Sequence, residues 1–273
     1  MDPFYLTGYA QEEILTFFAV LVRYSVLISV LPITGDRSIP MQVKILLSLS
    51  ISLALFPALV SRGQINPADA LRWGASMGSL VATILSEVLL GLVMGYVAQL
   101  LFSSISFGAN MVGTYMGFSA ASSFDAHQES QSQIVAQIQT TLAMLAFLAV
   151  NGHHLMLTAA LDSYRVVGLG QAWVTAASSQ RLIEFSGQII RFGVQISAPV
   201  ALAIFGINIA FGVVSKAIPQ LNVLVLSFAV TSMVGLLVMF LGTADFQAAS
   251  NLILGRMQDW MEAAALSMKA SGR

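Results

Sequence analysis

The stretches VLLGLVMGYVAQLLF (Val88–Phe102) and SSISFGANMVGTYMGFSAASSF (Ser103–Phe124) follow one another without a single Asp, Glu, Lys or Arg. The first, with the apolar residues before it, is long enough to cross a bilayer as a helix, which needs about 20 apolar residues. The second is rich in Gly, Ser, Ala, Met and Phe, a composition that suits neither lipid contact nor a solvated loop. Because irregular backbone at membrane depth must be enclosed by protein or line a water-filled cavity, the second stretch predicts a pore, a gate or an assembly core.

The composition of the whole chain is that of an integral membrane protein. Of its 273 residues, 57% are hydrophobic and 9% are charged, against roughly 25% charged residues in an average soluble domain. The 12 basic and 13 acidic side chains nearly cancel, so nucleic acid is not an expected partner. Cysteine is absent, which excludes disulfides and Cys-ligated metals. The acidic first residues lack the basic region of a cleavable signal peptide, so we expect the first apolar segment to be retained.

Apolar segments separated by polar turns predict an all-α, polytopic fold. The turn Ser215–Gln220 contains a proline and predicts a helical hairpin in the C-terminal part, whereas the stretch Asp162–Arg191 is amphipathic or loop. The predicted apolar segments are Ile14–Thr34, about Val43 to Val60 with its end at Pro57 and the turn Ser61–Pro67, roughly Trp73–Phe102, Ile138–Leu161, Phe192–Val214 and Leu221–Thr243, followed by an amphipathic helix in the tail to Arg273.

Two questions about the spans stay open at this point. The long third segment has room to tilt, to extend beyond the bilayer or to break at Gly91 and Gly95. The charged residues before the first segment are all acidic, whereas the basic residues Arg37 and Lys44 follow it. This distribution favours an N-terminus outside the cytoplasm. Later loops carry charges of both signs, and the same rule does not orient them.

Four blocks that together sample most of the chain carry a resemblance to a known family. They are ITGDRSIPMQVKILLSLSI (Ile33–Ile51), GTYMGFSAASSFDA (Gly113–Ala126), NGHHLMLTAALDSY (Asn151–Tyr164) and INIAFGVVSKAIPQLNVLVLSF (Ile207–Phe228). In their order and approximate spacing they resemble the FliR component of the flagellar type III export apparatus, whose counterparts serve virulence-associated injectisomes. No single block is specific, but the four in order make the resemblance strong.

The resemblance implies an architecture and a set of partners. It implies one export-apparatus domain, 1–273, with a FliP-like part at about 1–191 and a FliQ-like hairpin and tail at about 192–273. In the family, one copy joins several FliP and FliQ homologues in a helical assembly that forms the gated entrance of the export channel. Further implied partners are components of the FlhB and FlhA type and unfolded protein substrates in transit. The implied location is the bacterial inner membrane, in the flagellar basal body, with many hydrophobic helices buried against other subunits.

The family's plug loop corresponds to residues 116–132 of this chain. Glycines there allow unusual backbone conformations and close approach, and methionine and aromatic side chains supply deformable apolar volume. We hypothesise that this segment seals the lumen and moves aside for an unfolded substrate. The alternative is a GxxxG-type helix interface without a gate, which the residues alone favour and the resemblance disfavours. The candidate gate residues are Gly113, Tyr115, Met116, Gly117, Phe118 and Phe124.

Charged side chains inside apolar segments predict contacts that are buried in protein. A charge facing lipid costs about 2.5 kcal/mol or more, so Arg23 and Glu87 are expected to face protein or water. The simplest role for each is a structural ion pair or a bond to helix carbonyls. The sequence does not place these two residues and the histidines within reach of one another, so it does not support a proton relay.

Other polar residues predict turns, helix breaks or contacts between subunits. Asn151 and His153 belong to an NGHH element that predicts a helix break or a buried polar contact. Adjacent histidines on a helix point about 100° apart, so a metal site is disfavoured. Asp36 and Arg37 predict a turn with a local salt bridge, or alternatively a docking contact for a neighbouring subunit. The hairpin turn adds Pro219 and Gln220 as predicted contacts.

The sequence contains no H-E-x-x-H or G-x-x-x-x-G-K-[ST] motif. We therefore expect a protein that is not an enzyme, binds no cofactor and takes its energy from other subunits. The predicted function is a structural and gating subunit of the flagellar protein export channel. The alternatives are the equivalent injectisome subunit and a self-contained multipass solute transporter, which is disfavoured because the two halves show no internal repeat. An intramembrane enzyme is a distant third.

Overall fold

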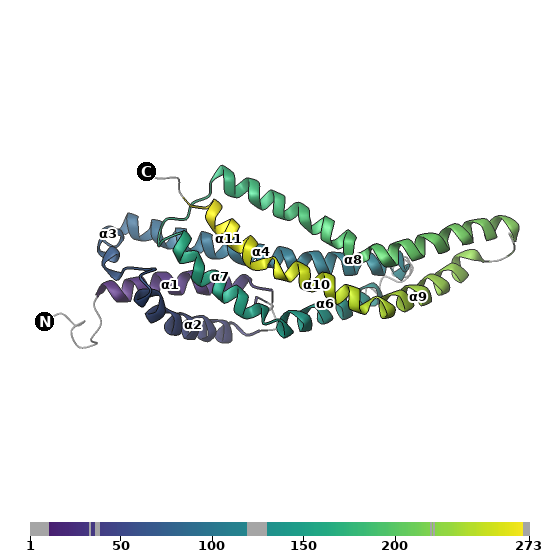
Figure 1. The fold of residues 1–273 in the computed structure, drawn as a ribbon, viewed down its shortest axis with the longest axis horizontal. Helices are drawn as coiled ribbons and strands as arrows, with labels where there is room; N and C mark the ends of the chain where they lie inside the picture. Colours follow the sequence, from purple (N-terminus) through teal and green to yellow (C-terminus); the bar gives the residue numbers. More distant parts are fainter. Residues whose placement is uncertain are drawn as a thin grey trace. The chain divides into compact units, whose positions relative to one another are not determined.

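The computed structural model describes residues 11–32, 34, 35, 39–118, 130–218, 220 and 222–269, except for the side chains of 130–135 and 224. Within these ranges the chain is helical apart from one isolated antiparallel bridge, between Ala172 and Lys269. The all-α prediction is therefore confirmed. The helices are α1 (Gln11–Val30), α2 (Met41–Ser61), η2 (Pro67–Asp69), α3 (Ala70–Trp73), α4 (Met77–Tyr115), α6 (Ser130–Ala149), α7 (Gly152–Val166), α8 (Ala176–Ala217), α9 (Val223–Leu241), α10 (Thr243–Gly255) and α11 (Met257–Ser267) (Figure 1).

Several of these helices are long and apolar enough to cross a membrane. Among the described residues, α1, α2, α4 and α8 qualify singly. The number of candidate spans rises from 4 to 6 if each of two bent combinations forms one span. The first combination is α6 with α7, and the second is α9 with the stretch that contains α10 and α11. The predicted polytopic character is confirmed by these lengths and compositions.

By their contacts, the residues group into two compact units, each built from separate stretches of the chain. Unit 1 contains Met1–Leu100, His153–Phe185 and Arg256–Arg273, and unit 2 contains Leu101–Gly152 and Ser186–Gly255. The helices α4 and α8 each contribute to both units. The predicted FliP-like and FliQ-like parts rest on a different criterion, the resemblance, and stay a prediction.

The course of α4 corrects the expectation of irregular backbone after Phe102. The helix runs from Met77 to Tyr115 over 39 residues, so most of the uncharged stretch is regular helix. The side chains of Ser104, Asn110 and Thr114 bond to backbone carbonyls three or four positions earlier, at 2.6, 2.8 and 3.0 Å. Small polar residues therefore satisfy their own hydrogen bonds within a helix, and their presence does not require a loop.

Glycines in α4 serve close packing and do not break the helix. In unit 1, a Cβ added to Gly91 would lie 2.8 Å from the carbonyl oxygen of Arg23, and one on Gly95 would lie 2.8 Å from Val30 Cβ. In unit 2, a Cβ on Gly108 would lie 2.8 Å from the carbonyl oxygen of Gly193 in α8. These contacts are the small-residue approach that is typical of membrane helices.

The fourth predicted segment, Ile138–Leu161, consists of two helices. They are separated at Asn151, which has φ of 55° and is the one non-glycine residue with positive φ in the described part of the chain. Asparagine tolerates this left-handed conformation better than most residues. A Cβ on the next residue, Gly152, would collide with the ring of Phe147. The predicted helix break in the NGHH element is observed.

Two boundaries differ from the prediction, and one agrees with it. Pro57 does not end α2, which continues to Ser61, the first residue of the predicted turn. A membrane helix tolerates the loss of the one hydrogen bond that an interior proline removes. The stretch Asp162–Arg191 is mostly helical, since α8 already begins at Ala176. The C-terminal hairpin is confirmed, with α8 ending at Ala217 and α9 beginning at Val223.

We expect Gly108→Ala to lower the thermal unfolding temperature of the detergent-purified chain relative to the matched change Gly206→Ala. Alanine is about 1 kcal/mol better than glycine inside a helix, and a Cβ on Gly206 meets nothing within 4 Å. At Gly108 the added methyl group pushes against backbone that cannot give way. Circular dichroism during heating measures the difference, and a Gly108→Ala protein as stable as Gly206→Ala would contradict the close approach of α4 and α8.

Candidate functional site

A buried ion pair joins α1 to α4 in unit 1. Arg23 Nε donates to Glu87 Oε2 at 2.5 Å, and Arg23 Nη2 donates to Glu87 Oε1 at 3.1 Å. Both side chains are fully buried. The paired geometry is the strong, directional form of an arginine–carboxylate contact. The structure thus brings together two residues that the sequence could not place near each other.

The end of α7 and the loop after it complete the surroundings of this pair. Arg23 Nη1 donates to Ser163 Oγ at 2.9 Å, and the guanidinium carbon lies 3.7 Å from the centre of the Tyr164 ring, which is cation–π distance. The backbone N–H of Gly170 donates to Glu87 Oε1 at 2.9 Å. Ser163, Tyr164 and Gly170 carry no sequence signal for this role, because nothing in their spacing points to Arg23.

The loop between α7 and α8 is held on both sides within unit 1. Ala172 N donates to Ser86 Oγ at 2.8 Å, one residue before Glu87 in α4. Trp173 N donates to the carbonyl of Met268, just after α11, at 2.9 Å. Hydrogen bonds of this loop therefore connect α4 and the end of α11 next to the Arg23–Glu87 ion pair. The arrangement suits a fixed register of helices, which is the best-attested use of buried charge pairs.

The predicted gate segment begins at the end of α4 in unit 2. Met116 is fully buried among Val112, Val200 and Ile204. Its carbonyl accepts hydrogen bonds from the hydroxyls of Thr231 and Ser232 in α9, both at 3.3 Å. Met116 is thus packed against α8 and hydrogen-bonded to α9. It is an anchor, and this position differs from the adaptable apolar volume that the sequence suggested for it.

Gly117 follows the end of α4, where the chain turns. Its φ of 87° is a conformation that other residues rarely adopt, as is common for a glycine after a helix C-terminus. A Cβ here would lie 3.0 Å from Phe228 Cδ2, and the rings of Phe118 and Phe228 meet edge to face with centroids 6.0 Å apart. We call Met116, Gly117 and Phe118, with their contacts on α9, the α4 anchor.

The remaining candidate gate residues lie around this anchor or beyond it. Gly113 is buried inside α4, and the Tyr115 side chain is 37% exposed. Phe124 lies outside the described residues, as does most of the predicted plug, residues 116–132. Whether the segment closes a lumen therefore stays a prediction.

The other predicted contact residues are scattered. Asn151 is exposed at the helix break, and the rings of His153 and His154 lie 4.3 Å apart between centroids. His153 Nδ1 is buried without a hydrogen-bond partner among the described residues. The same part of the chain contains no group of three or more metal-binding side chains. Gln220 is exposed in the hairpin turn, whereas Asp36, Arg37 and Pro219 lie outside the described residues.

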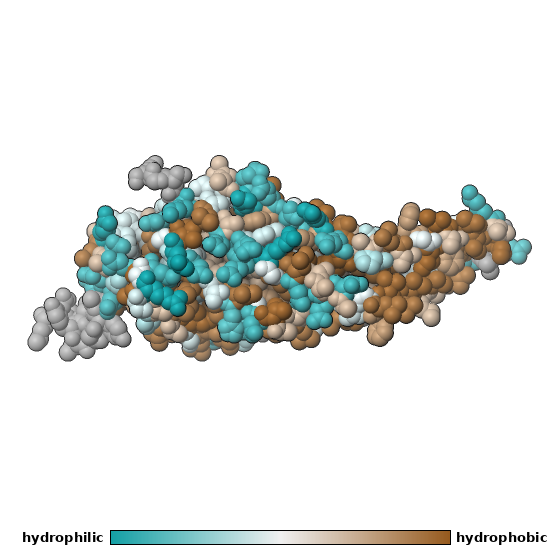
Figure 2. Space-filling model, in the orientation of Figure 1, coloured by the Kyte–Doolittle hydropathy of each residue, from teal (hydrophilic) through white to brown (hydrophobic). Residues whose placement is uncertain are grey.

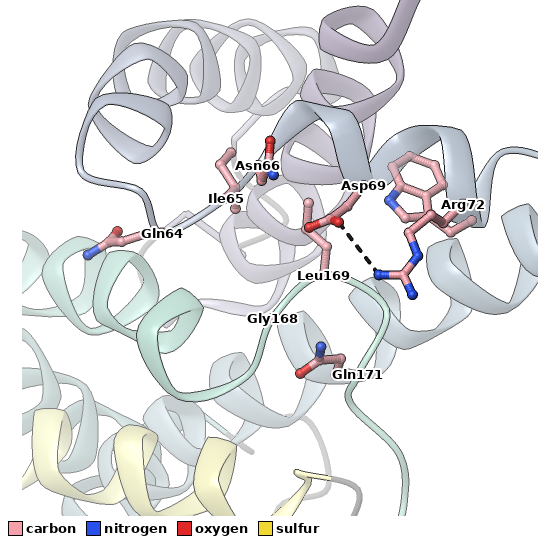
Figure 3. Close-up of a pocket in the computed structure, with 9 residues that line it drawn as sticks. Gln64, Ile65, Asn66, Asp69, Arg72, Gly168, Leu169 and Gln171 are labelled. Atoms are coloured by element: carbon pink, nitrogen blue, oxygen red, sulfur yellow. Dashed lines mark ion pairs between the residues drawn. The ribbon is translucent and has the colours of Figure 1, made fainter. Parts of the chain in front are cut away.

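A polar pocket of about 370 Å³ opens on unit 1 (Figure 3). It lies between the connection from α2 to α3, with Gln64 and Asn66, and the loop after α7, with Gln171. Asp69 and Arg72 form an exposed ion pair at 4.0 Å in its lining. The labelled side chains offer amides and one charge pair of opposite signs, without a nucleophile beside a base, so the pocket suits polar contact more than catalysis.

A broad apolar surface covers the second half of α8 and the length of α9 in unit 2 (Figure 2). Large side chains there are highly exposed, among them Leu202 at 71%, Met233 at 76% and Phe240 at 78%. An apolar surface of this kind marks contact with lipid or with other proteins.

Comparison with known proteins gives a consistent family. A sequence model described as bacterial export proteins, family 1, matches residues 14–257. The flagellar biosynthetic protein FliR of Escherichia coli (strain K12) is 27% identical over 223 residues, 82% of each chain. The FliR protein of Pectobacterium carotovorum subsp. carotovorum is 29% identical over 81% of each chain. The FliR protein of Bacillus subtilis (strain 168) is 28% identical over 77% of this chain and 78% of its own length.

We expect Arg23→Met and Glu87→Leu each to destabilise unit 1 by about 3–5 kcal/mol, because each change leaves one buried charge without its partner. The double variant Arg23→Met/Glu87→Leu should recover much of this loss, since it removes both charges. Thermal unfolding in detergent measures the effect. Arg165→Leu is the control, because Arg165 pairs with Asp162 at 3.8 Å on an exposed surface, where a pair contributes little. A double variant no more stable than the single ones would contradict this account.

Proposed function

The chain belongs to the bacterial export proteins, family 1, and on this premise we propose that it is a structural and gating subunit of the flagellar protein export channel. Its family and its similarity to FliR proteins make it a membrane component of the flagellar export apparatus. The gating role, the inner-membrane location in the flagellar basal body and the individual partners are our proposal. The equivalent role in an injectisome is the less favoured alternative, because the relatives named above are all flagellar.

The observation that carries the proposal is the α4 anchor. A loop that closes a channel needs fixed ends, so that its middle can move while its attachment stays in place. Before the segment 119–129, Met116 is held by two hydrogen bonds to α9 and by packing against α8. After this segment, α6 begins at Ser130 and packs against α10 in the same unit. Both attachments of the proposed plug thus belong to unit 2.

The proposed partners are FliP and FliQ homologues, with components of the FlhB and FlhA type beyond them and unfolded substrates passing through. The exposed apolar side chains of α8 and α9 support such an assembly, because both helices of the hairpin leave large apolar side chains uncovered by the rest of the described chain. We infer that the hairpin is the FliQ-like part and that it packs against the FliQ homologues. We also infer a role without catalysis, in line with a family of export components.

Deletion of residues 119–123 should open a leak for small ions in cells that assemble the complete export complex. The deletion leaves Met116, Gly117 and Phe118 in place, so the anchor and the α8–α9 packing are kept. Membrane conductance or uptake of a small dye measures the leak, and co-purification with the FliP and FliQ homologues verifies assembly. The same deletion in cells without these homologues is the control and should not leak. An assembled complex without a leak would remove the gating role.

Phe240→Lys should abolish co-purification with the coexpressed FliP and FliQ homologues while leaving the unfolding temperature of the chain itself unchanged. Phe240 is 78% exposed, so a lysine there disturbs few contacts within the chain but places a charge on the proposed interface. Gln247→Lys, on the exposed side of α10, is the matched control and should assemble normally. Equal recovery of complex with Phe240→Lys and Gln247→Lys would refute the assembly role of this surface.

A further inference from the structure

An apolar groove of about 500 Å³ lies between α1 and α2 in unit 1. Phe17 of α1 and Phe56 of α2 meet edge to face within its lining, with ring centroids 5.7 Å apart. Ile14, Leu53, Pro57 and Val60 add apolar walls, and Glu13 and Ser61 complete the lining near the ends of the two helices. The groove thus has an apolar length and one polar end.

The position of the groove fits one leaflet of a bilayer. Both α1 and α2 are long and apolar enough to cross a membrane, and the groove between them is lined by residues of these two helices. From Leu53 to Ser61 the helix rises about 12 Å, which is less than half of the roughly 30 Å hydrocarbon thickness. If Ser61, the last residue of α2, lies at the membrane interface, the apolar walls reach into a single leaflet, where lipid acyl chains are the surrounding molecules.

Charges of both signs stand at the polar end. Among the described residues, Glu13 is the one charged residue in the groove lining, and Glu12 precedes it. Arg62 directly follows Ser61 as the C-cap of α2 and is exposed. A headgroup with an ammonium and a phosphate can satisfy both signs, whereas an anionic headgroup without an amine is repelled by the two carboxylates. This complementarity distinguishes between lipids that offer the same acyl chains.

We propose that this groove binds one acyl chain of a phospholipid whose headgroup carries a primary amine, with the ammonium at Glu13 and the phosphate on the side of Arg62. Apolar contact alone does not select a lipid, because the acyl chains of the bilayer are as apolar as the groove. Selection comes from the headgroup. The site requires only the membrane-embedded chain, and it goes beyond the proposed export function.

Native mass spectrometry of the full-length chain tests the site, with an equimolar mixture of dioleoyl phosphatidylethanolamine and dioleoyl phosphatidylglycerol as the probe. We expect one bound lipid, with a preference of about two- to fivefold for phosphatidylethanolamine, as an exposed charge contact supplies. Glu13→Gln should remove the preference and keep binding. Leu53→Trp should fill the groove and remove the bound lipid. Leu46→Trp is the matched control, because Leu46 is 62% exposed, against 64% for Leu53, but does not line the groove.

Equal binding of the two lipids to the unaltered chain would overturn the proposal. So would an unchanged preference in Glu13→Gln, or loss of lipid in Leu46→Trp to the same extent as in Leu53→Trp. A photo-crosslinking residue at position 53 in cells provides the second arm, and a crosslink to phosphatidylethanolamine supports the site. A crosslink only to another protein would assign the groove to a subunit contact instead. None of these measurements depends on export or gating, so their failure leaves the proposed function standing.

Discussion

The buried contact between Arg23 and Glu87 fixes how the surrounding helices of unit 1 can be arranged. Two charges that are removed from water are stable only if each is paired and hydrogen-bonded. Here the guanidinium is met by the carboxylate, Ser163 and the face of Tyr164, and the carboxylate by the N–H of Gly170. These groups come from α1, α4, α7 and the following loop. A shift of any one of these elements would leave a buried charge without a partner and so destabilise unit 1. The ion pair thereby selects one arrangement of the helices.

Unit 2 is organised by close approach. Gly108 brings α4 against the backbone of α8, and Gly235 leaves room for the Met116 side chain, since a Cβ there would lie 2.5 Å from Met116 Cγ. Small residues allow helices to make many van der Waals contacts where the hydrophobic effect offers no drive between membrane helices. The same closeness lets α9 donate two hydroxyl hydrogen bonds to the end of α4. The end of α4 is therefore firmly attached to α9, as the proposed gating role requires.

Sequence reasoning reached the helical segments, the C-terminal hairpin and the break at Asn151, because apolar runs, prolines and an Asn-Gly pair act locally. It was wrong for Ser103–Tyr115, where the small polar residues predicted irregular backbone and the structure has regular helix. Composition does not reveal that such side chains bond to carbonyls of their own helix or that glycines face a neighbouring helix. It also could not pair Arg23 with Glu87, since contacts between helices far apart in the chain leave no spacing pattern. The anchor role of Met116 was missed for the same reason, because it depends on α9.

The loop after α7 also links parts of unit 1 that lie far apart in the sequence. Trp173 bonds to the carbonyl of Met268, and Ala172 pairs with Lys269, so unit 1 combines the first hundred residues with the last ones. During synthesis, Arg23 and Glu87 enter the membrane well before Ser163 and Tyr164 are made, and α11 emerges last. Unit 1 therefore cannot be completed before α11 has been synthesised, whereas every residue of unit 2 precedes Arg256. Because unit 1 is discontinuous in sequence, Arg23 and Glu87 are synthesised before the groups that surround them in the folded chain. The nascent chain must therefore hold this charge pair before its hydrogen-bond partners exist.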